Sequence, residues 1–132
     1  MKVSHVGIAV PSLKEAKAFY EALGIPCGGE EEVPGQKVRV AFFEAGESRI
    51  ELLESTDPDG PVGKFLAKRG PGLHHLCLEV PDLDRALARL KERGYALLDD
   101  RPREGAGGRK VAFVHPRSAG GVLLELTEGE KR

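Results

Sequence analysis

The chain begins with an alternation of aliphatic and small or polar residues and continues with a helical spacing. Positions 6, 8 and 10 are aliphatic in the segment His5–Val10, which predicts a strand with one buried face. From Leu13 to Leu23 the apolar residues stand three or four positions apart, which predicts a helix packed against that strand. Gly24 follows directly and is typical of a helix C-terminus.

The same pattern returns 70 residues later. His75–Leu83 repeats the strand and helix start of His5–Leu13, and Gly94 closes the second helical pattern as Gly24 closes the first. Two later segments also repeat: Val40–Phe43 as Val111–Val114, and Ile50–Leu53 as Leu124–Thr127. Each half is therefore predicted to be a βαβββ module, and the chain a duplication of that module.

We expect one α+β domain over residues 1–132, in which the two βαβββ modules form a cupped mixed sheet around a metal site. The modules cover about residues 1–58 and 72–130, and a short helical linker over 61–70 joins them. Pro61 can begin that linker helix, because its fixed φ suits a first turn. Ser12 and Asp82 are the predicted N-caps of the two module helices.

Side-chain parity separates the polar residues of the strands from the aliphatic ones, because alternate side chains point to opposite faces. One histidine and one glutamate in each module lie opposite the aliphatic stripe at positions that are equivalent in the repeat: His5 and Glu51, His75 and Glu125. Two imidazoles and two carboxylates suit a divalent ion such as Zn, Ni, Co, Mn or Fe. On the residues alone, the alternative stays open that these are ordinary polar side chains of half-solvated strands.

The remaining histidines and Cys77 are predicted to be structural. His74 has the opposite parity to His75 and is expected at the sheet edge, whereas His115 begins a turn. Cys77 shares the face of His75 but is interpreted as a small buried residue, since free cysteines are among the most buried residue types. Cys27 and Cys77 do not have the spacing of a zinc ribbon or a redox motif.

Composition and charge narrow the classes of function. The chain has 132 residues, 40% apolar and 31% charged, with 20 basic against 21 acidic side chains, so no net field favours nucleic acid. No apolar run approaches the ~20 residues that cross a bilayer, and the N-terminus has no signal-peptide core, which predicts a cytoplasmic protein. The absence of Asn, beside abundant Glu, Lys and Arg, indicates a thermophilic source.

The motifs resemble the vicinal oxygen chelate superfamily, which includes the glyoxalase and bleomycin resistance proteins, over nearly the whole chain. Within it, the chain resembles the methylmalonyl-CoA epimerases at Val62–Gly70, Gly72–Leu76 and His115–Leu126. The resemblance implies a homodimer and an isomerase that interconverts the (R) and (S) epimers of methylmalonyl-CoA. It also implies a divalent metal, with Co, Zn, Ni and Mn as candidates, held by His5, Glu51, His75 and Glu125.

The implied reaction is a 1,1-proton transfer through a metal-stabilised enolate, which requires an acid/base group on each face of the α-carbon. Glu125 resembles the residue that serves the family as both ligand and base. The second base is open, because Val40 stands where some members carry Glu. Glu44 shares the parity of Val40 but lies roughly 13 Å along the strand, at ~3.3 Å per residue. Glu51 or a bound water is therefore expected to serve the opposite face.

Two other functions fit the same fold. The set of two histidines and two glutamates also resembles glyoxalase I, a lactoylglutathione lyase. A non-catalytic small-molecule binding protein is the third possibility, although it would not need four convergent ligands. Coenzyme A carries phosphates, so an epimerase requires basic residues near its site. The candidates are Arg117, Lys64 and Lys68. Neither nucleic acid nor a membrane is expected as a partner.

Overall fold

The computed structural model describes residues 1–129, and its contacts divide the chain into two compact units. One unit comprises residues 5–74, and the other comprises residues 1–4 together with the chain from residue 75 onward. Residues 130–132, which end the predicted domain and its second module, lie outside the described residues. Over the described range, no helix is both long and apolar enough to span a membrane.

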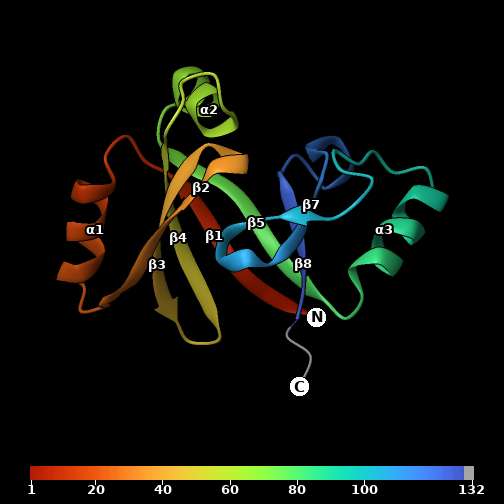
Figure 1. Ribbon diagram of the computed structural model, residues 1–132, viewed down its shortest axis with the longest axis horizontal. Helices are drawn as coiled ribbons and strands as arrows, with labels where there is room; N and C mark the ends of the chain where they lie inside the picture. The colour runs from red at the N-terminus through yellow and green to blue at the C-terminus, as the bar shows by residue number, and fades with distance from the viewer. Residues whose placement is uncertain (130–132) are drawn as a thin grey trace. The chain divides into compact units, whose positions relative to one another are not determined.

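The first module has the predicted βαβββ order (Figure 1). Its elements are β1 (Lys2–Ala9), α1 (Leu13–Ala22), β2 (Cys27–Val33), β3 (Val38–Ala45) and β4 (Ser48–Ser55), with a 3₁₀ turn η1 (Pro34–Gln36) before β3. The strand order is β2-β3-β4-β1, in which β1 and β4 run parallel and the other neighbours antiparallel. Parallel pairing is possible because α1 and the β2–β3 hairpin give the chain a long return path.

The second module repeats this arrangement. Its elements are β5 (Gly72–Val80), α3 (Leu83–Glu92), β6 (Arg103–Glu104), β7 (Lys110–Val114) and β8 (Leu124–Glu128), with 3₁₀ turns η2 (Ala106–Gly108) and η3 (Pro116–Ser118). The order β6-β7-β8-β5 matches that of the first module, and β5 and β8 are again the parallel pair. The predicted α+β class and the duplication are therefore confirmed.

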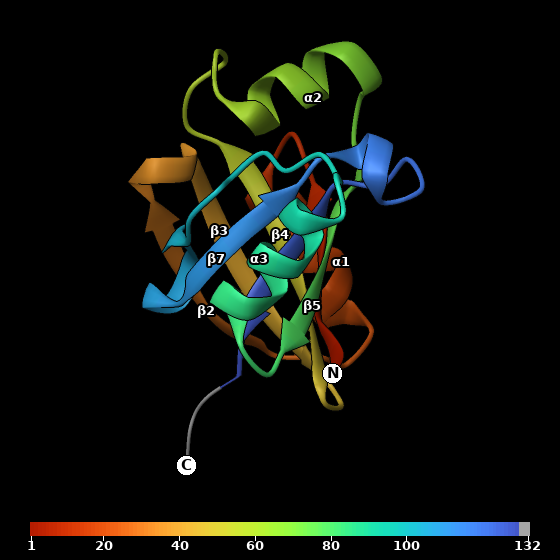
Figure 2. The same cartoon turned by 90° about the vertical axis from the view of Figure 1, so that its right-hand side faces the viewer.

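Each module has an apolar core between its helix and one face of its strands. In the first module Leu13 of α1 packs with Phe43 and Leu52. In the second, Leu87 of α3 packs with Leu126 and its neighbours on β5 and β7, over which α3 lies in Figure 2. Because a helix covers one face of each set of strands, the polar residues of opposite parity are left on the other face.

The two module helices begin in the same way. Ser12 and Asp82, the predicted N-caps, each accept a hydrogen bond from the backbone N–H three residues on, at 3.2 and 3.0 Å. Glu54 and Glu128, near the ends of β4 and β8, each accept another from the first helical N–H, at 2.8 and 3.1 Å. These bonds satisfy N–H groups that have no partner within the helix, so the duplication extends to the helix starts.

Helix α2 (Pro61–Arg69) confirms the linker helix predicted over 61–70. Pro61 occupies its first turn. A Cβ at Gly63 would lie 2.6 Å from the carbonyl oxygen of Asp57, so the preceding turn packs against this helix only where the residue is glycine. Gly70 follows the helix with a φ of 76°, which glycine adopts without strain.

The modules differ most in their second strand. β2 pairs with β3 along its length, from Cys27 to Val33. Its counterpart in the second module is reduced to an isolated bridge between Leu97 and Val114 and the two-residue strand β6. The glycine-rich segment over residues 105–108 contains the turn η2, in which Gly107 has a positive φ.

Candidate functional site

His5 and Glu51 lie on the strand face that α1 does not cover. The register of β4 places Glu51 beside Gly7 of β1, and His5 beside Arg49. Leu52, the residue after Glu51, belongs to the core under α1. The alternation of β4 therefore directs Glu51 away from the core, as its parity in the sequence predicts.

The side chains of His5 and Glu51 contact each other and are almost wholly buried. Nδ1 of His5 lies 3.3 Å from Oε2 of Glu51, and the two residues are 6% and 2% exposed. Arg49 joins them: its Nη2 lies 2.9 Å from the same Oε2 and 3.5 Å from Nδ1 of His5. In the first module, one oxygen atom of the Glu51 carboxylate thus contacts both the imidazole of His5 and the guanidinium of Arg49.

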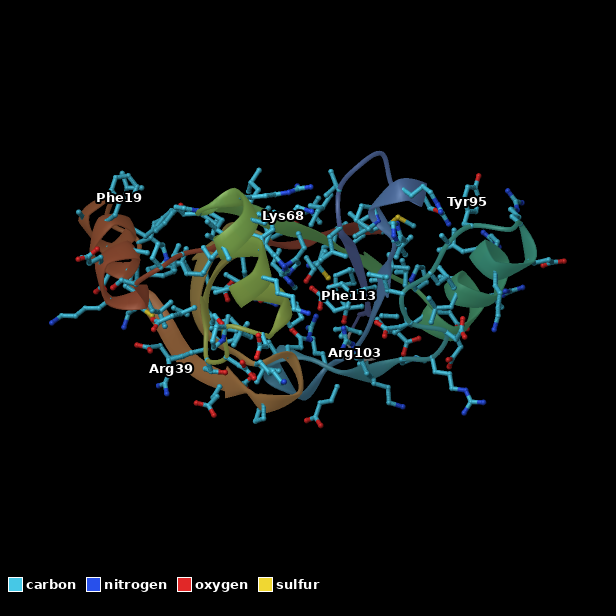
Figure 3. The ribbon with its side chains drawn as sticks, turned by 90° about the horizontal axis from the view of Figure 1, so that it is seen from above. Phe19, Arg39, Lys68, Tyr95, Arg103 and Phe113 are labelled. Atoms are coloured by element: carbon cyan, nitrogen blue, oxygen red, sulfur yellow. The ribbon has the colours of Figure 1, made fainter. Side chains whose placement is uncertain are left out.

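His75 and Glu125 form the matching pair in the second module. Nε2 of His75 lies 3.1 Å from Oε1 of Glu125, and the residues are 7% and 4% exposed. Phe113 is the cross-strand partner of Glu125, and its ring meets the His75 ring edge-on with centroids 6.1 Å apart. The guanidinium carbon of Arg103 lies 4.9 Å from the Phe113 centroid (Figure 3). The His75–Glu125 pair therefore lies next to the Phe113 ring, which makes a cation–π contact with Arg103.

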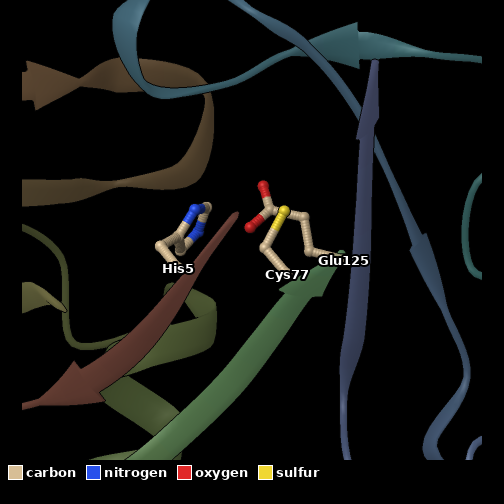
Figure 4. A group of neighbouring side chains, drawn as sticks. All are labelled: His5, Cys77 and Glu125. Atoms are coloured by element: carbon tan, nitrogen blue, oxygen red, sulfur yellow. The ribbon is translucent and has the colours of Figure 1, made fainter. Parts of the chain in front are cut away.

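Cys77 lies beside Glu125 in the second module (Figure 4). The two residues are register partners on β5 and β8. The Sγ atom of Cys77 lies within 4.8 Å of a carboxylate oxygen of Glu125. Cys77 is fully buried, as the sequence predicts. Its place next to a predicted ligand was not predicted, since it depends on the register between two strands.

The burial of the two pairs separates them from ordinary strand residues. Over residues 1–129, the buried histidines and carboxylates are His5, Glu51, His75 and Glu125 and no others. Removing such groups from water costs folding free energy, which pairing within each module only partly offsets. Half-solvated strands keep their polar side chains in water. The burial therefore favours a functional site over the alternative that the sequence left open.

The donor atoms fit the divalent metal that the sequence predicts. Each pair offers an imidazole nitrogen and a carboxylate oxygen close to each other. Nitrogen and oxygen donors of these types are those that Zn, Co, Ni and Mn take in proteins. The structure brings His5 together with Glu51 and His75 together with Glu125, so each module has one imidazole and one carboxylate in contact.

The surroundings of Val40 bear on the second acid/base group. Val40 is buried and apolar, and Glu44 is exposed near the end of β3. Glu31 on β2 is the direct cross-strand partner of Val40, so the two side chains share a face, and Glu31 is partly buried. Sequence reasoning missed Glu31, because only the strand register reveals that it adjoins Val40.

The predicted coenzyme A contacts are exposed. Lys64 and Lys68 lie on α2, where Figure 3 labels Lys68, and Arg117 lies in η3. His115 accepts a hydrogen bond from the backbone N–H of Arg117 at 3.0 Å, which agrees with its predicted structural role. His74 meets the Phe65 ring edge-on with centroids 5.1 Å apart, so it too has a packing role.

Arg49 is a residue of the site that sequence reasoning missed. It stands two positions before Glu51 on the same strand, and residues two apart in a strand point to the same face. A search for basic residues two positions from each predicted ligand would have found it. The strand parity that selects Glu51 therefore selects this cation as well.

Comparison with known proteins places these residues in a family. The sequence profile of the glyoxalase/bleomycin resistance protein/dioxygenase superfamily matches residues 4–113. The mitochondrial methylmalonyl-CoA epimerase of Bos taurus is 39% identical over 129 residues, 96% of this chain and 74% of the bovine protein. The ethylmalonyl-CoA/methylmalonyl-CoA epimerase of Cereibacter sphaeroides is 39% identical over 130 residues, 96% and 97% of the two chains. A Streptomyces coelicolor methylmalonyl-CoA epimerase variant with 2-nitronate-propionyl-CoA superposes with a TM-score of 0.94, at 36% identity over 99% of each chain.

Proposed function

Because the chain belongs to the glyoxalase/bleomycin resistance protein/dioxygenase superfamily and, within it, to the methylmalonyl-CoA epimerase family, we propose that it interconverts (R)- and (S)-methylmalonyl-CoA. The observation that carries the proposal is the buried His–Glu contact that recurs at equivalent positions of the two modules. The S. coelicolor relative binds an acyl-CoA analogue, which supports a CoA thioester as the substrate.

The proposed metal ligands are His5, Glu51, His75 and Glu125. Their support comes from the burial of all four and from the repeat, which supplies the same two donors twice. A bound divalent ion such as Co, Zn, Ni or Mn would act as a Lewis acid that stabilises the enolate of the thioester. The buried faces on which the four residues lie would exclude water and so strengthen every charge interaction with the substrate.

Epimerisation further requires that protein groups move a proton at the α-carbon. The proton must leave from one face and return from the other, so one carboxylate on each face is the simplest arrangement. We assign one face to Glu125 and the other to Glu51, acting directly or through a water molecule. Val40 has no proton to exchange, and Glu31, its cross-strand partner, is the residue to test against Glu51.

Coenzyme A binding is assigned to exposed basic side chains outside the two pairs. Arg117, Lys64 and Lys68 are the candidates, because an exposed cation can bind phosphate at small cost in desolvation. Replacing Arg117 with Ala is expected to raise the KM for the CoA substrate and leave kcat nearly unchanged, since this contact lies away from the reacting carbon. An unchanged KM would exclude Arg117 from the binding site.

The experiment that tests the function offers the Co²⁺-treated protein two substrates. In D₂O, an epimerase incorporates deuterium at the α-carbon of methylmalonyl-CoA and converts one epimer into the other, which mass spectrometry and chiral analysis detect. Methylglyoxal with glutathione serves as the second substrate. Turnover of methylglyoxal without exchange into methylmalonyl-CoA would identify a glyoxalase I, and activity on neither substrate would favour a binding protein.

The homodimer, the cytoplasmic location and the thermophilic source stay predictions from the sequence. Light scattering after gel filtration measures the first, with twice the mass of the 14.2 kDa chain as the expected value. A thermal unfolding midpoint well above the ~45–65 °C of mesophilic domains is expected for a thermophilic protein.

A further inference from the structure

Arg49 lies on the two atoms of the first module that are proposed to bind the metal. Its Nη2 is 2.9 Å from Oε2 of Glu51 and 3.5 Å from Nδ1 of His5, and these two atoms are 3.3 Å apart. One guanidinium nitrogen therefore faces both donors of the His5–Glu51 pair. In the second module, the guanidinium of Arg103 lies over the ring of Phe113, the cross-strand partner of Glu125.

We propose that Arg49 is an internal cation that competes with the divalent metal for the His5–Glu51 pair. It neutralises Glu51 while the metal is away, and it gives up its contact with Oε2 when the metal binds. This inference rests on the proposed metal role of the two residues, and it adds that Arg49 sets how tightly the metal is held. Arg49 is thus a positioning residue, because it acts through Glu51.

The burial of the group supplies the first step of the reasoning. The Glu51 side chain is only 3% exposed, and a buried carboxylate without a cation costs several kcal/mol of folding free energy. Arg49 satisfies that carboxylate with a short, charge-assisted hydrogen bond. Loss of the guanidinium is therefore expected to destabilise the protein when no metal replaces it.

The second step is that Oε2 of Glu51 cannot bind a metal ion and keep its full hydrogen bond with Arg49 at the same time. A divalent ion bound to Oε2 and to the imidazole would place two like charges a few ångströms apart, and their repulsion opposes binding. The Arg49 side chain is 24% exposed, so it has access to solvent and can turn away from Glu51. Metal affinity accordingly includes the free energy needed to release Arg49.

The two steps predict that one substitution at Arg49 lowers stability without metal and raises metal affinity. Arg49→Met keeps much of the side-chain volume and removes the charge, so it should lower the unfolding temperature of the protein in EDTA. The same change should tighten Co²⁺ binding by about tenfold, since the competing cation is gone. Metal should then raise the unfolding temperature more in the variant than in the wild type, because tighter binding to the folded state gives a larger stabilisation.

Matched variants separate charge from shape. Arg49→Lys retains the charge and should stay near the wild type in both measurements. The double variant Arg49→Met/Glu51→Gln removes the carboxylate together with the cation, so it should recover much of the stability lost by Arg49→Met in EDTA. A purely structural role for the Arg49 side chain would give no such recovery.

The experiment measures Co²⁺ affinity from the visible absorption of the bound ion and unfolding temperature with and without EDTA. Tighter Co²⁺ binding by Arg49→Met, together with lower stability in EDTA, supports the competition. Weaker or unchanged Co²⁺ binding by Arg49→Met overturns it, even if the wild type binds the ion well. Absence of Co²⁺ binding by the wild type would instead contradict the proposed metal site and, with it, this inference.

Discussion

The two modules share their strand register but differ in what surrounds the His–Glu pair. In both, the glutamate of the last strand lies opposite a phenylalanine, Phe42 for Glu51 and Phe113 for Glu125. In the first module Arg49 contacts the glutamate, whereas its repeat equivalent in the second module is Leu123. In the second module Cys77 is the register partner of the glutamate, where the first module has Gly7 beside Glu51.

The comparison shows which properties the duplication preserved. The strand order and the register around each His–Glu pair depend on the backbone and on the apolar stripe, and these are the same in both modules. The electrostatic partner of each glutamate depends on single side chains, and those differ. The difference therefore offers a way to assign separate roles to two residues that occupy equivalent positions.

Substitution of the two glutamates should produce the largest effect. If Glu125 and Glu51 serve opposite faces, Glu125→Gln should slow deuterium exchange from one epimer by ~10²–10⁴-fold, and Glu51→Gln should slow exchange from the other. Exchange into each pure epimer in D₂O, with Co²⁺ content measured in parallel, checks this. Loss of exchange from the second epimer in Glu31→Gln instead of Glu51→Gln would move that role to Glu31.

Much of the fold, and the two histidines and two glutamates of the candidate site, could be predicted from the sequence. The repeat located His5, Glu51, His75 and Glu125 and the four elements that hold them, because parity and helical spacing are local properties. The contact of Arg49 with Glu51 and the pairing of Glu31 with Val40 were not predicted. The first needs parity applied to cations and the second needs the register of two strands, which the local pattern does not contain.

Equivalent core positions should respond equally. Leu52 and Leu126 occupy the same place in the repeat, and both are buried under the module helix. Leu52→Ala and Leu126→Ala should each lower the free energy of unfolding by ~2–5 kcal/mol, from lost burial and a residual cavity. Urea denaturation measures both. A loss several times larger in one module would show that the two cores do not contribute alike.

The linker helix α2 has no counterpart in the repeat. We expect its packing on the preceding turn to make one glycine sensitive to substitution. Gly63→Ala would bring a Cβ within 2.6 Å of the Asp57 carbonyl oxygen, and the forced shift should cost ~1–3 kcal/mol. Gly35→Ala is the matched control, since a Cβ there meets no atom within 4 Å. Equal stability of the two variants in urea would contradict the close packing of α2 on its turn.

The helix starts give a smaller and symmetrical effect. Glu54 and Glu128 each accept a hydrogen bond from the first N–H of a module helix. Replacing either with Ala should cost ~0.5–2 kcal/mol, the range of helix-cap losses. Similar losses of stability in the two variants, measured by thermal unfolding, would show that the two hydrogen bonds contribute equally to the two modules. A neutral Glu128→Ala would restrict the capping role to the first module.

The smallest effect is expected in the turn before α2. A hydrogen bond from the backbone N–H of Asp59, and then the ammonium of Lys37, hold the pKa of Asp57 below its ordinary value. A carboxylate with a lowered folded pKa stabilises the protein above its unfolded pKa, and this contribution disappears as the pH falls through the folded pKa. Asp57→Asn should thus be slightly less stable at pH 7 and equal to the wild type in strong acid. A difference independent of pH would contradict an electrostatic origin.

The number of metal ions that each chain binds, and the residues that bind them, test the proposed metal site most directly. Equilibrium dialysis against Co²⁺, with metal measured by atomic spectrometry, should give one ion per chain for the wild type. His5→Ala and His75→Ala should each weaken that binding strongly, since each removes one of the four ligands proposed for a single ion. Unchanged Co²⁺ binding in either variant, or two ions per chain, would contradict the claim that the modules share one catalytic metal.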